Sequence, residues 1–140
     1  MSNSSTSRQK LKVILDSNAL FVPLELKIDI FEETERLLNQ NIDFILLSPV
    51  KHELELLAAK DSPKTRRMAS YALKLAERCK YIAVENKGKL STDDVIVEVS
   101  ESWKCPVFTN DRNLRKRLKD ISVPVIYVRQ KSRLDIDGLI

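Results

Sequence analysis

The stretch VFTNDRNLRKRL, residues 107–118, leads from a short β-rich run of apolar residues into a helical pattern. Residues 107–111 predict a strand that closes on Asp111, and residues 113–120 predict a helix with Leu114 and Leu118 on its buried face. A strand followed at once by a helix is the unit from which parallel sheets are built. The junction between the two is also where such sheets bind their ligands.

The same alternation of strand and helix patterns continues toward both ends of the chain. It predicts a three-layer α/β/α fold, in which helices cover both faces of a parallel five-stranded sheet. No repeat or low-complexity linker divides the sequence, so one domain is expected at residues 11–130, between a flexible tail at 1–10 and a short extension at 131–140. The predicted strands are 11–16, 43–48, 81–85, 107–111 and 124–128, and the predicted helices are 28–40, 50–60, about 64–79, 91–103 and 113–120.

The composition limits what such a domain can do. The chain has 140 residues, of which 43% are hydrophobic and 31% charged, as expected for one globular domain. No apolar run approaches the roughly 20 residues of a membrane-spanning helix, and the first nine residues lack the apolar core of a signal peptide. A cytoplasmic protein without membrane association is therefore expected. One histidine, two cysteines and two glycines exclude a Cys/His zinc site and a glycine-rich phosphate loop.

Four carboxylates map to one edge of the predicted sheet. Asp16 and Asp111 end strands, while Glu53 and Asp93 lie in the first turns of helices that follow strands. Because the carboxyl ends of parallel strands share an edge, these four side chains are expected to converge. Each alone has an ordinary structural explanation, the two strand-end aspartates as turn residues or helix caps and the two first-turn acids as complements to the helix dipole, so their shared edge carries the argument. Oxygen ligands without His or Cys favour Mg²⁺ or Mn²⁺.

Helical phase distinguishes Glu53 from the nearby Glu55. Val50, Leu54 and Leu57 form the apolar stripe of the helix at 50–60. Glu53 lies about 60° from that stripe, whereas Glu55 lies roughly opposite it. Glu53 is therefore expected at the buried edge and Glu55 in solvent.

The same reasoning separates the adjacent residues Asp93 and Asp94. Asp93 borders the apolar stripe of the helix at 91–103, whereas Asp94 points away from it. Asp94 also stands three residues after Ser91, which predicts a capping box at the start of this helix. The residues expected to face inward are Ile96, Val99 and Trp103, with Val95 beside them.

Positive charge is concentrated toward the C-terminal end of the chain. Residues 112–133 hold eight lysines and arginines against the single acid Asp120, a net charge of +7, which leaves −3 for the rest of the chain. Such asymmetry predicts a polyanionic partner, with a solvated helix face as the alternative. The residues expected to contact a nucleic-acid backbone are Arg112, Arg115, Lys116 and Arg117.

Four segments resemble the PIN-domain ribonuclease family: LDSNAL (15–20), PVKHELELL (49–57), STDDVIVEVS (91–100) and VFTNDRNLRKRL (107–118). They follow the family's order and spacing, and the resemblance covers about residues 11–130. It implies the strand order 3-2-1-4-5 and an endoribonuclease activity that depends on Mg²⁺ or Mn²⁺. The catalytic and metal-binding set that it implies is Asp16, Glu53, Asp93 and Asp111. The residues that match its supporting polar positions are Asn18, Thr109 and Asn110.

Two branches of the family stay open: proteins tied to ribosomal RNA processing, with a ribosome-assembly partner, and VapC-type toxins, with an antitoxin partner. The resemblance also implies a homodimer. Two other functions compete with the nuclease, namely a non-catalytic RNA-binding module and a phospho-receiver domain. An acidic pocket hinders phosphate binding unless metal fills it, which counts against the first. A receiver needs a second acid beside Asp16 and a lysine after the last strand, where the chain has Ser17 and Arg129.

Overall fold

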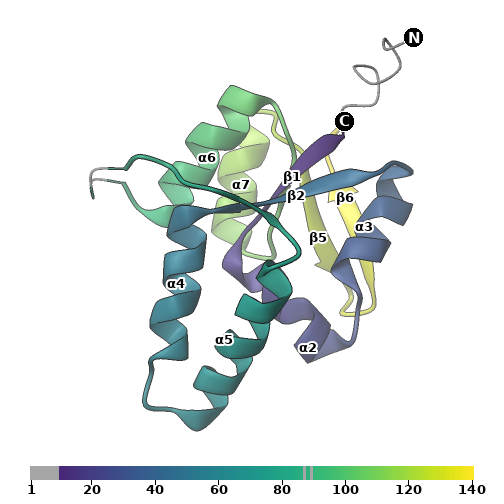
Figure 1. The fold of residues 1–140 in the computed structure, drawn as a ribbon. Helices are drawn as coiled ribbons and strands as arrows, with labels where there is room; N and C mark the ends of the chain where they lie inside the picture. Colours follow the sequence, from purple (N-terminus) through teal and green to yellow (C-terminus); the bar gives the residue numbers. More distant parts are fainter. Residues whose placement is uncertain (1–9, 87, 89) are drawn as a thin grey trace, which may run out of the picture.

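The computed structural model describes residues 10–86, 88 and 90–140, and its strands form one sheet (Figure 1). The strand order is β3-β2-β1-β4-β5-β6, and the neighbours from β3 to β5 pair in parallel. The predicted order of the first five strands is confirmed. Residues 1–9 of the predicted tail lie outside the described residues. The strands are β1 (Leu11–Leu15), β2 (Ile42–Leu47), β3 (Lys80–Ile82), β4 (Val107–Phe108), β5 (Val125–Arg129) and β6 (Arg133–Asp137).

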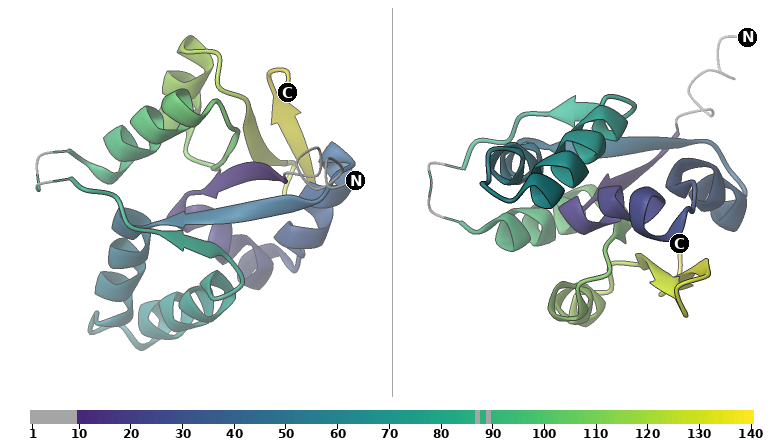
Figure 2. Two further views of the ribbon diagram at one scale, coloured as in Figure 1. Left: turned by 45° about the horizontal axis from the view of Figure 1, so that its top comes forward. Right: turned by 90° about the horizontal axis from the view of Figure 1, so that it is seen from below.

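Helices cover both faces of the sheet, as predicted. Helices α2 to α5 lie on one face and α6 and α7 on the other, and β1 to β3 run between these two layers (Figure 2, left). Among the helices of the described residues, none is long and apolar enough to cross a membrane. The helices are α2 (Val22–Leu26), α3 (Ile30–Leu38), α4 (Ser48–Ala58), α5 (Pro63–Ala76), α6 (Thr92–Trp103) and α7 (Arg112–Asp120), with a short 3-10 helix η1 (Ser17–Phe21).

The predicted extension at residues 131–140 contributes a sixth strand to the sheet. β6 pairs antiparallel with β5, and its Leu134 is buried in the core. Gln130 and Lys131, in the turn between the two strands, adopt left-handed backbone with φ of 54° and 58°. Hairpin sequences usually mark such positions with Gly, Asn or Asp. Because neither residue is of these types, the sequence carries no hairpin signal, and the sheet has one antiparallel strand beyond the five parallel strands predicted.

The chain turns sharply after the two strands that carry the predicted aspartates. η1 and α2 follow Asp16 directly, and both are too short to show a helical period in the sequence. The strand predicted at 107–111 ends at Phe108, because Asp111 already serves as the N-cap of α7. Both aspartates therefore lie where the backbone leaves the sheet, which is the edge that the sequence predicts for ligand binding.

The inward face of α6 differs from the predicted one at its C-terminal end. Val95 and Ile96 are buried as expected, but Trp103 is 38% exposed and Ser100 is fully buried instead. The apolar pattern alone places Trp103 inward. Serine is smaller than tryptophan, and it can be buried when its hydroxyl has a hydrogen-bond partner within the helix. The Ser100 hydroxyl donates to the carbonyl of Val97 at 3.1 Å. A search for apolar residues at helical spacing does not detect small buried polar residues of this kind.

Candidate active site

Asp16 follows β1 and is almost fully buried, with 5% of its surface exposed. The backbone N–H of Ser17 donates to its Oδ1 at 2.8 Å, and Oδ2 accepts from Asn18 Nδ2 at 2.9 Å and Thr109 Oγ1 at 2.8 Å. Burial raises the pKa of Asp16 to about 6, although the Thr109 hydroxyl and the Ser17 N–H act against this shift. The carboxylate is therefore rigidly oriented, but its negative charge is costly without a cation nearby.

The polar residues predicted as supporting positions connect the ends of three strands. Thr109 is fully buried, and its Oγ1 accepts from Asn18 Nδ2 at 3.3 Å and from the backbone N–H of Asp111 at 3.1 Å. Asn18 Oδ1 accepts from the backbone N–H of Asn110 at 3.0 Å. Asn110 Oδ1 in turn accepts from the N–H of Val128 at 2.8 Å, so the network reaches β5. These bonds hold the residues after β1 and β4 in a fixed relation.

Glu53 approaches the same edge from α4. This helix begins at Ser48, so Glu53 lies in its second turn and not in the first turn that the sequence predicts. Val50 and Leu54 are fully buried, and Glu53 is half-buried beside them, in agreement with the predicted helical phase. The Ser17 hydroxyl donates to Glu53 Oε1 at 3.3 Å. Through this contact Glu53 is joined to the residue that follows Asp16.

Asp111 and Asp93 complete the acidic set from α7 and α6. Asp111 Oδ1 accepts two backbone N–H groups of the first turn of α7, at 2.8 and 3.1 Å. Burial raises the pKa of Asp93, and the charges of Asp111 and Glu53 raise it further, while Arg117 lowers it. The charges of Asp93 and Glu53 likewise add to the raised pKa of Asp16. The four carboxylates thus act on one another across one edge of the sheet.

Asp94 has a different environment from Asp93. It forms the predicted capping box with Ser91, whose hydroxyl accepts from the Asp94 N–H at 3.1 Å. Its Oδ1 also accepts from Arg117 at 2.8 Å, and this ion pair joins α6 to α7. The hydrogen bonds from Arg117 and Ser91 lower the pKa of Asp94. The sequence predicts the cap but not the ion pair, because the two partners are 23 residues apart.

Two of the four cations predicted to contact nucleic acid have partners within the protein. Arg117 pairs with Asp94, and the Arg115 guanidinium lies 3.6 Å from the centre of the Tyr127 ring and 3.6 Å from Asp137 Oδ2. Asp137 belongs to β6, just beyond the basic segment 112–133, and so offsets part of its charge. The other two predicted cations line a cavity of about 460 Å³ on α7, whose lining residues are Arg112, Arg115, Lys116, Lys119 and Asp137.

The donor atoms at the carboxylate edge are all oxygens. Within the described part of the chain, no three His, Cys, Asp or Glu side chains stand close enough together to hold one ion by themselves. Mg²⁺ is commonly bound by one or two carboxylates and keeps several waters, unlike structural Zn²⁺, which takes four protein ligands. The raised pKa values of Asp16 and Asp93 point the same way, because a cation would relieve the repulsion that raises them. The residues therefore fit a hard divalent cation bound partly through water.

The fold and this edge define an α/β protein with four interacting carboxylates at the edge formed by the carboxyl ends of its parallel strands. The family model described as "PIN like domain" matches residues 13–131. The chain belongs to this family, and the resemblance predicted from the four sequence segments is confirmed.

Several known proteins are similar over most of the chain. Ribonuclease VapC4 of Methanocaldococcus jannaschii is 31% identical over 129 residues, which cover 92% of this chain and 98% of the relative. Ribonuclease VapC9 of Archaeoglobus fulgidus is 31% identical over 69% of this chain and 68% of its own length. The structure of the PIN domain endonuclease Utp24 shows 30% identity and a TM-score of 0.77, and covers 92% of each chain. VapBC2 from Rickettsia felis, at 17% identity and a TM-score of 0.61 over 85% of this chain and 100% of that chain, shares the fold.

Proposed function

We propose that this protein is a divalent-metal-dependent endoribonuclease that hydrolyses RNA phosphodiester bonds. The observation that carries the proposal is the mutual influence of Asp16, Glu53, Asp93 and Asp111 at one sheet edge, where two of the four pKa values are raised. Mg²⁺ or Mn²⁺ at this edge would supply Lewis-acid stabilisation of the phosphodiester and a lower pKa of the attacking water. The names of the relatives, ribonuclease VapC4 and endonuclease Utp24, support the same chemistry.

The decisive test is cleavage of a fluorescent single-stranded RNA. The full-length protein should cut it in millimolar manganese and leave it intact in chelator. Cleavage that persists in chelator would contradict the metal dependence. A protein that binds this RNA but never cuts it, whatever divalent metal is added, would instead be the non-catalytic binding module.

The site of action that we propose is the cytoplasm, and two partners are proposed as alternatives. The VapC names of two relatives favour an antitoxin, whereas the resemblance to ribosomal RNA processing proteins favours a ribosome-assembly partner. A homodimer is compatible with either. The neighbouring gene separates the two, because a small antitoxin frame would favour the toxin and ribosomal genes would favour processing.

The RNA backbone is proposed to run along one face of α7. Arg112, Lys116 and Lys119 are spaced i, i+4 and i+7, so they lie on one side of the helix, and all three line the cavity of about 460 Å³. Arg112 follows Asp111 directly, so this basic row begins at the carboxylate edge. A phosphate bound by the row would be led toward the acids.

Replacing Arg112, Lys116 and Lys119 with Ala should weaken RNA binding equally for all sequences. Loss of three phosphate contacts should reduce the slope of log Kd against log salt by about 2. Folding should survive, because the core contacts of α7 come from Leu114 and Leu118, both fully buried. The measurement is fluorescence anisotropy across a salt series.

The matched control for this row is the pair Arg115→Ala and Arg117→Ala. These side chains are engaged with Asp137, Tyr127 and Asp94, so their removal should change the salt slope less than removal of the row does. An unchanged slope in the Arg112, Lys116 and Lys119 variant would show that RNA takes another path and that the row is a solvated face.

Thr109→Val should shift the pH dependence of cleavage. Among the hydrogen bonds of Asp16, that of the Thr109 hydroxyl lowers its pKa most, so removing it should raise this pKa further. The acidic limb of the kcat/KM profile should therefore move to higher pH. The unfolding free energy should fall by about 1–3 kcal/mol, since buried polar groups lose their partner. Thr109→Ser, which keeps the hydroxyl, should return the acidic limb to its wild-type pH. An acidic limb that does not move in Thr109→Val would mean that Thr109 contributes only packing and does not affect the pKa of Asp16.

A further inference from the structure

The second helix of the α4–α5 pair carries positive charge that the proposed active site does not use. α5 contains Lys64, Arg66, Arg67 and Lys74 and no acidic residue. Arg66 serves the turn before the helix, because its guanidinium donates to the backbone carbonyls of Lys60 and Asp61 at 3.1 and 2.8 Å. The remaining cations of α5 need another explanation.

Helical phase gathers these cations around an exposed aromatic ring. Arg67, Tyr71 and Lys74 are spaced i, i+4 and i+7, so they share one face of α5. All three are exposed, and Tyr71 retains 44% of its surface. The opposite face is formed by small residues packed into the protein, namely Ala69, Ala72 and Ala76. The exposed face thus alternates positive charge with an aromatic ring.

A shallow cavity of about 300 Å³ adjoins Tyr71. Leu75, Lys27 and Arg78 contribute to its lining, and the Arg78 guanidinium lies over the Phe31 ring, 4.1 Å from its centre. The acid that lines it, Asp29, is occupied by the N-cap of α3, where its Oδ1 accepts two backbone N–H groups at 3.0 and 3.1 Å. The cavity therefore combines apolar walls with cations, as a site for a nucleobase and its phosphate would.

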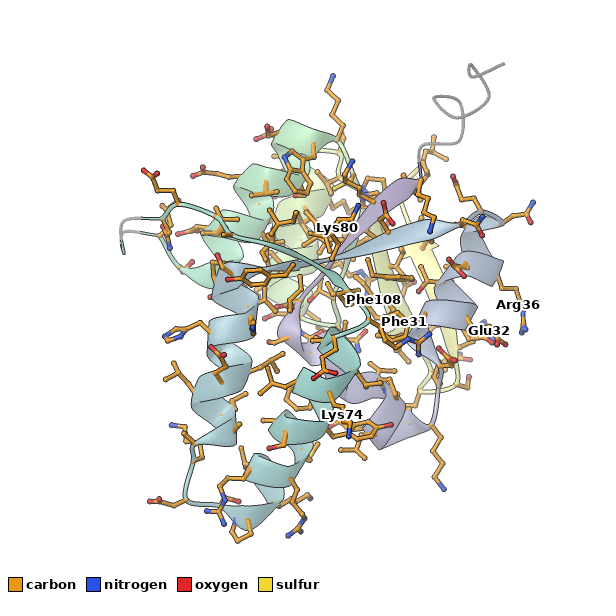
Figure 3. All side chains as sticks on the ribbon, viewed as in Figure 1. Phe31, Glu32, Arg36, Lys74, Lys80 and Phe108 are labelled. Atoms are coloured by element: carbon orange, nitrogen blue, oxygen red, sulfur yellow. The ribbon has the colours of Figure 1, made fainter. Side chains whose placement is uncertain are left out.

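The helices that carry this surface and the α7 row lie on either side of the segment that follows Asp16 (Figure 2, right). α5 packs against η1, which begins immediately after Asp16, whereas α7 begins immediately after Asp111. Seen from below, α5 and α7 lie on opposite sides of the segment that contains η1 and α2 (Figure 2, right). Lys74 lies where α5 passes beside α2 (Figure 3). A strand that crosses the acids from α7 would thus meet α5 on leaving them.

We infer that the face of α5 formed by Arg67, Tyr71 and Lys74 is a second binding surface for single-stranded RNA, on which a base stacks on Tyr71 while the two cations hold the adjoining phosphates. This inference rests on the proposed ribonuclease function. Aromatic rings interleaved with cations are the usual means of holding single strands without sequence preference. A second copy of the chain suits the face poorly, because a two-fold dimer through α5 would bring like charges together.

The test compares RNAs of about 4 and about 16 nucleotides, which bracket the usual single-strand site sizes. Anisotropy in chelator gives the Kd of each for the wild type and for the triple variant Arg67→Ala, Tyr71→Ala and Lys74→Ala. The affinity advantage of the longer RNA should fall about tenfold, and its salt slope should fall by about 1.4. Arg67→Ala with Lys74→Ala should account for the slope, and Tyr71→Phe, which keeps the ring, should retain the advantage that Tyr71→Ala loses.

The matched control removes two cations and a tyrosine elsewhere: Lys51→Ala, Lys80→Ala and Tyr81→Ala, where Lys51 lies over the exposed Tyr81 ring at 5.0 Å. This variant should keep the length advantage. The inference is overturned if the α5 variant also keeps the affinity advantage of the longer RNA, or if the wild type shows no such advantage. It is also overturned if the α5 variant changes the sedimentation mass, because the face would then be a protein interface. A wild type that never cleaves RNA but shows the predicted length effect would refute the nuclease alone.

Discussion

Asp93→Asn should abolish manganese-dependent RNA cleavage, whereas Asp94→Asn should leave most of it. Asp93 interacts with Asp111 and Glu53, and its pKa is raised by burial and by their charges. Asparagine keeps the size of the side chain but removes one negative ligand. Even partners outside the ligand set cost 10- to 100-fold when mutated, so loss of a ligand itself should cost at least about a hundredfold. Cleavage of a fluorescent single-stranded RNA measures the loss.

Asp94→Asn is the matched control for this substitution, one residue away on the same helix. It removes the charge that pairs with Arg117 at 2.8 Å and weakens the capping box with Ser91, so the first turn of α6 should be less stable. Because Asp94 is not one of the proposed metal ligands, those four carboxylates should stay in place. In chelator, Asp93→Asn should be at least as stable as the wild type, because one repelling charge is gone. If Asp94→Asn loses activity and Asp93→Asn keeps it, the ligand is Asp94 and the predicted helical phase is wrong by one residue. If both variants keep activity, the proposed nuclease function is refuted.

Without metal, the protein should lose stability as pH rises from about 4 to about 6. The pKa of Asp16 is raised from 3.8 to about 6 in the folded state, so folding favours its protonated form. The stabilisation that protonated Asp16 provides is fully present below the unfolded pKa and is lost as pH rises through about 6, at a cost of about 3 kcal/mol. Urea unfolding in chelator across this range measures it. Asp16→Asn should flatten this dependence, and an equally steep loss in that variant would mean that another group titrates.

Manganese should reverse that loss at neutral pH. At a hundredfold excess over its Kd, a ligand of the folded state adds about 2.7 kcal/mol, which corresponds to roughly 9 °C in Tm for a chain of this size. The gain should shrink toward pH 5, because protonated Asp16 must release its proton before binding. Melting curves with and without manganese at pH 5 and 7 test both statements. A gain that is the same at both values would mean that the ion binds without Asp16.

The sequence was informative about the carboxylates because the relevant forces are local. A strand end and the helix turn after it are set by nearby residues, and a parallel sheet then brings those ends to one edge. Helical phase likewise distinguishes Asp93 from Asp94 within a single helix. The same method fails for Trp103, which is 38% exposed, because it counts apolar residues and overlooks the buried Ser100.

For the basic segment 112–133, counting charge along the sequence does not show which cations are available to bind nucleic acid. A count of charge over residues 112–133 treats the five cations of α7 as equivalent, yet Arg115 and Arg117 have partners on other elements. One partner, Asp137, lies on the strand that the sequence does not predict. Which cations face a ligand therefore depends on the hairpin of β5 and β6, and not on the density of charge along the chain.

By itself, the sequence determined the α/β class and placed four carboxylates at one edge of the sheet, since both follow from the local spacing of apolar and acidic residues. Only the tertiary structure decided how strongly those acids are perturbed and which cations have partners. The pKa of Asp16 depends on its burial and on Thr109, 93 residues away, and the pairing of Arg117 depends on a helix 23 residues away. Desolvation and Coulomb interactions act through space, so no pattern along the chain contains them.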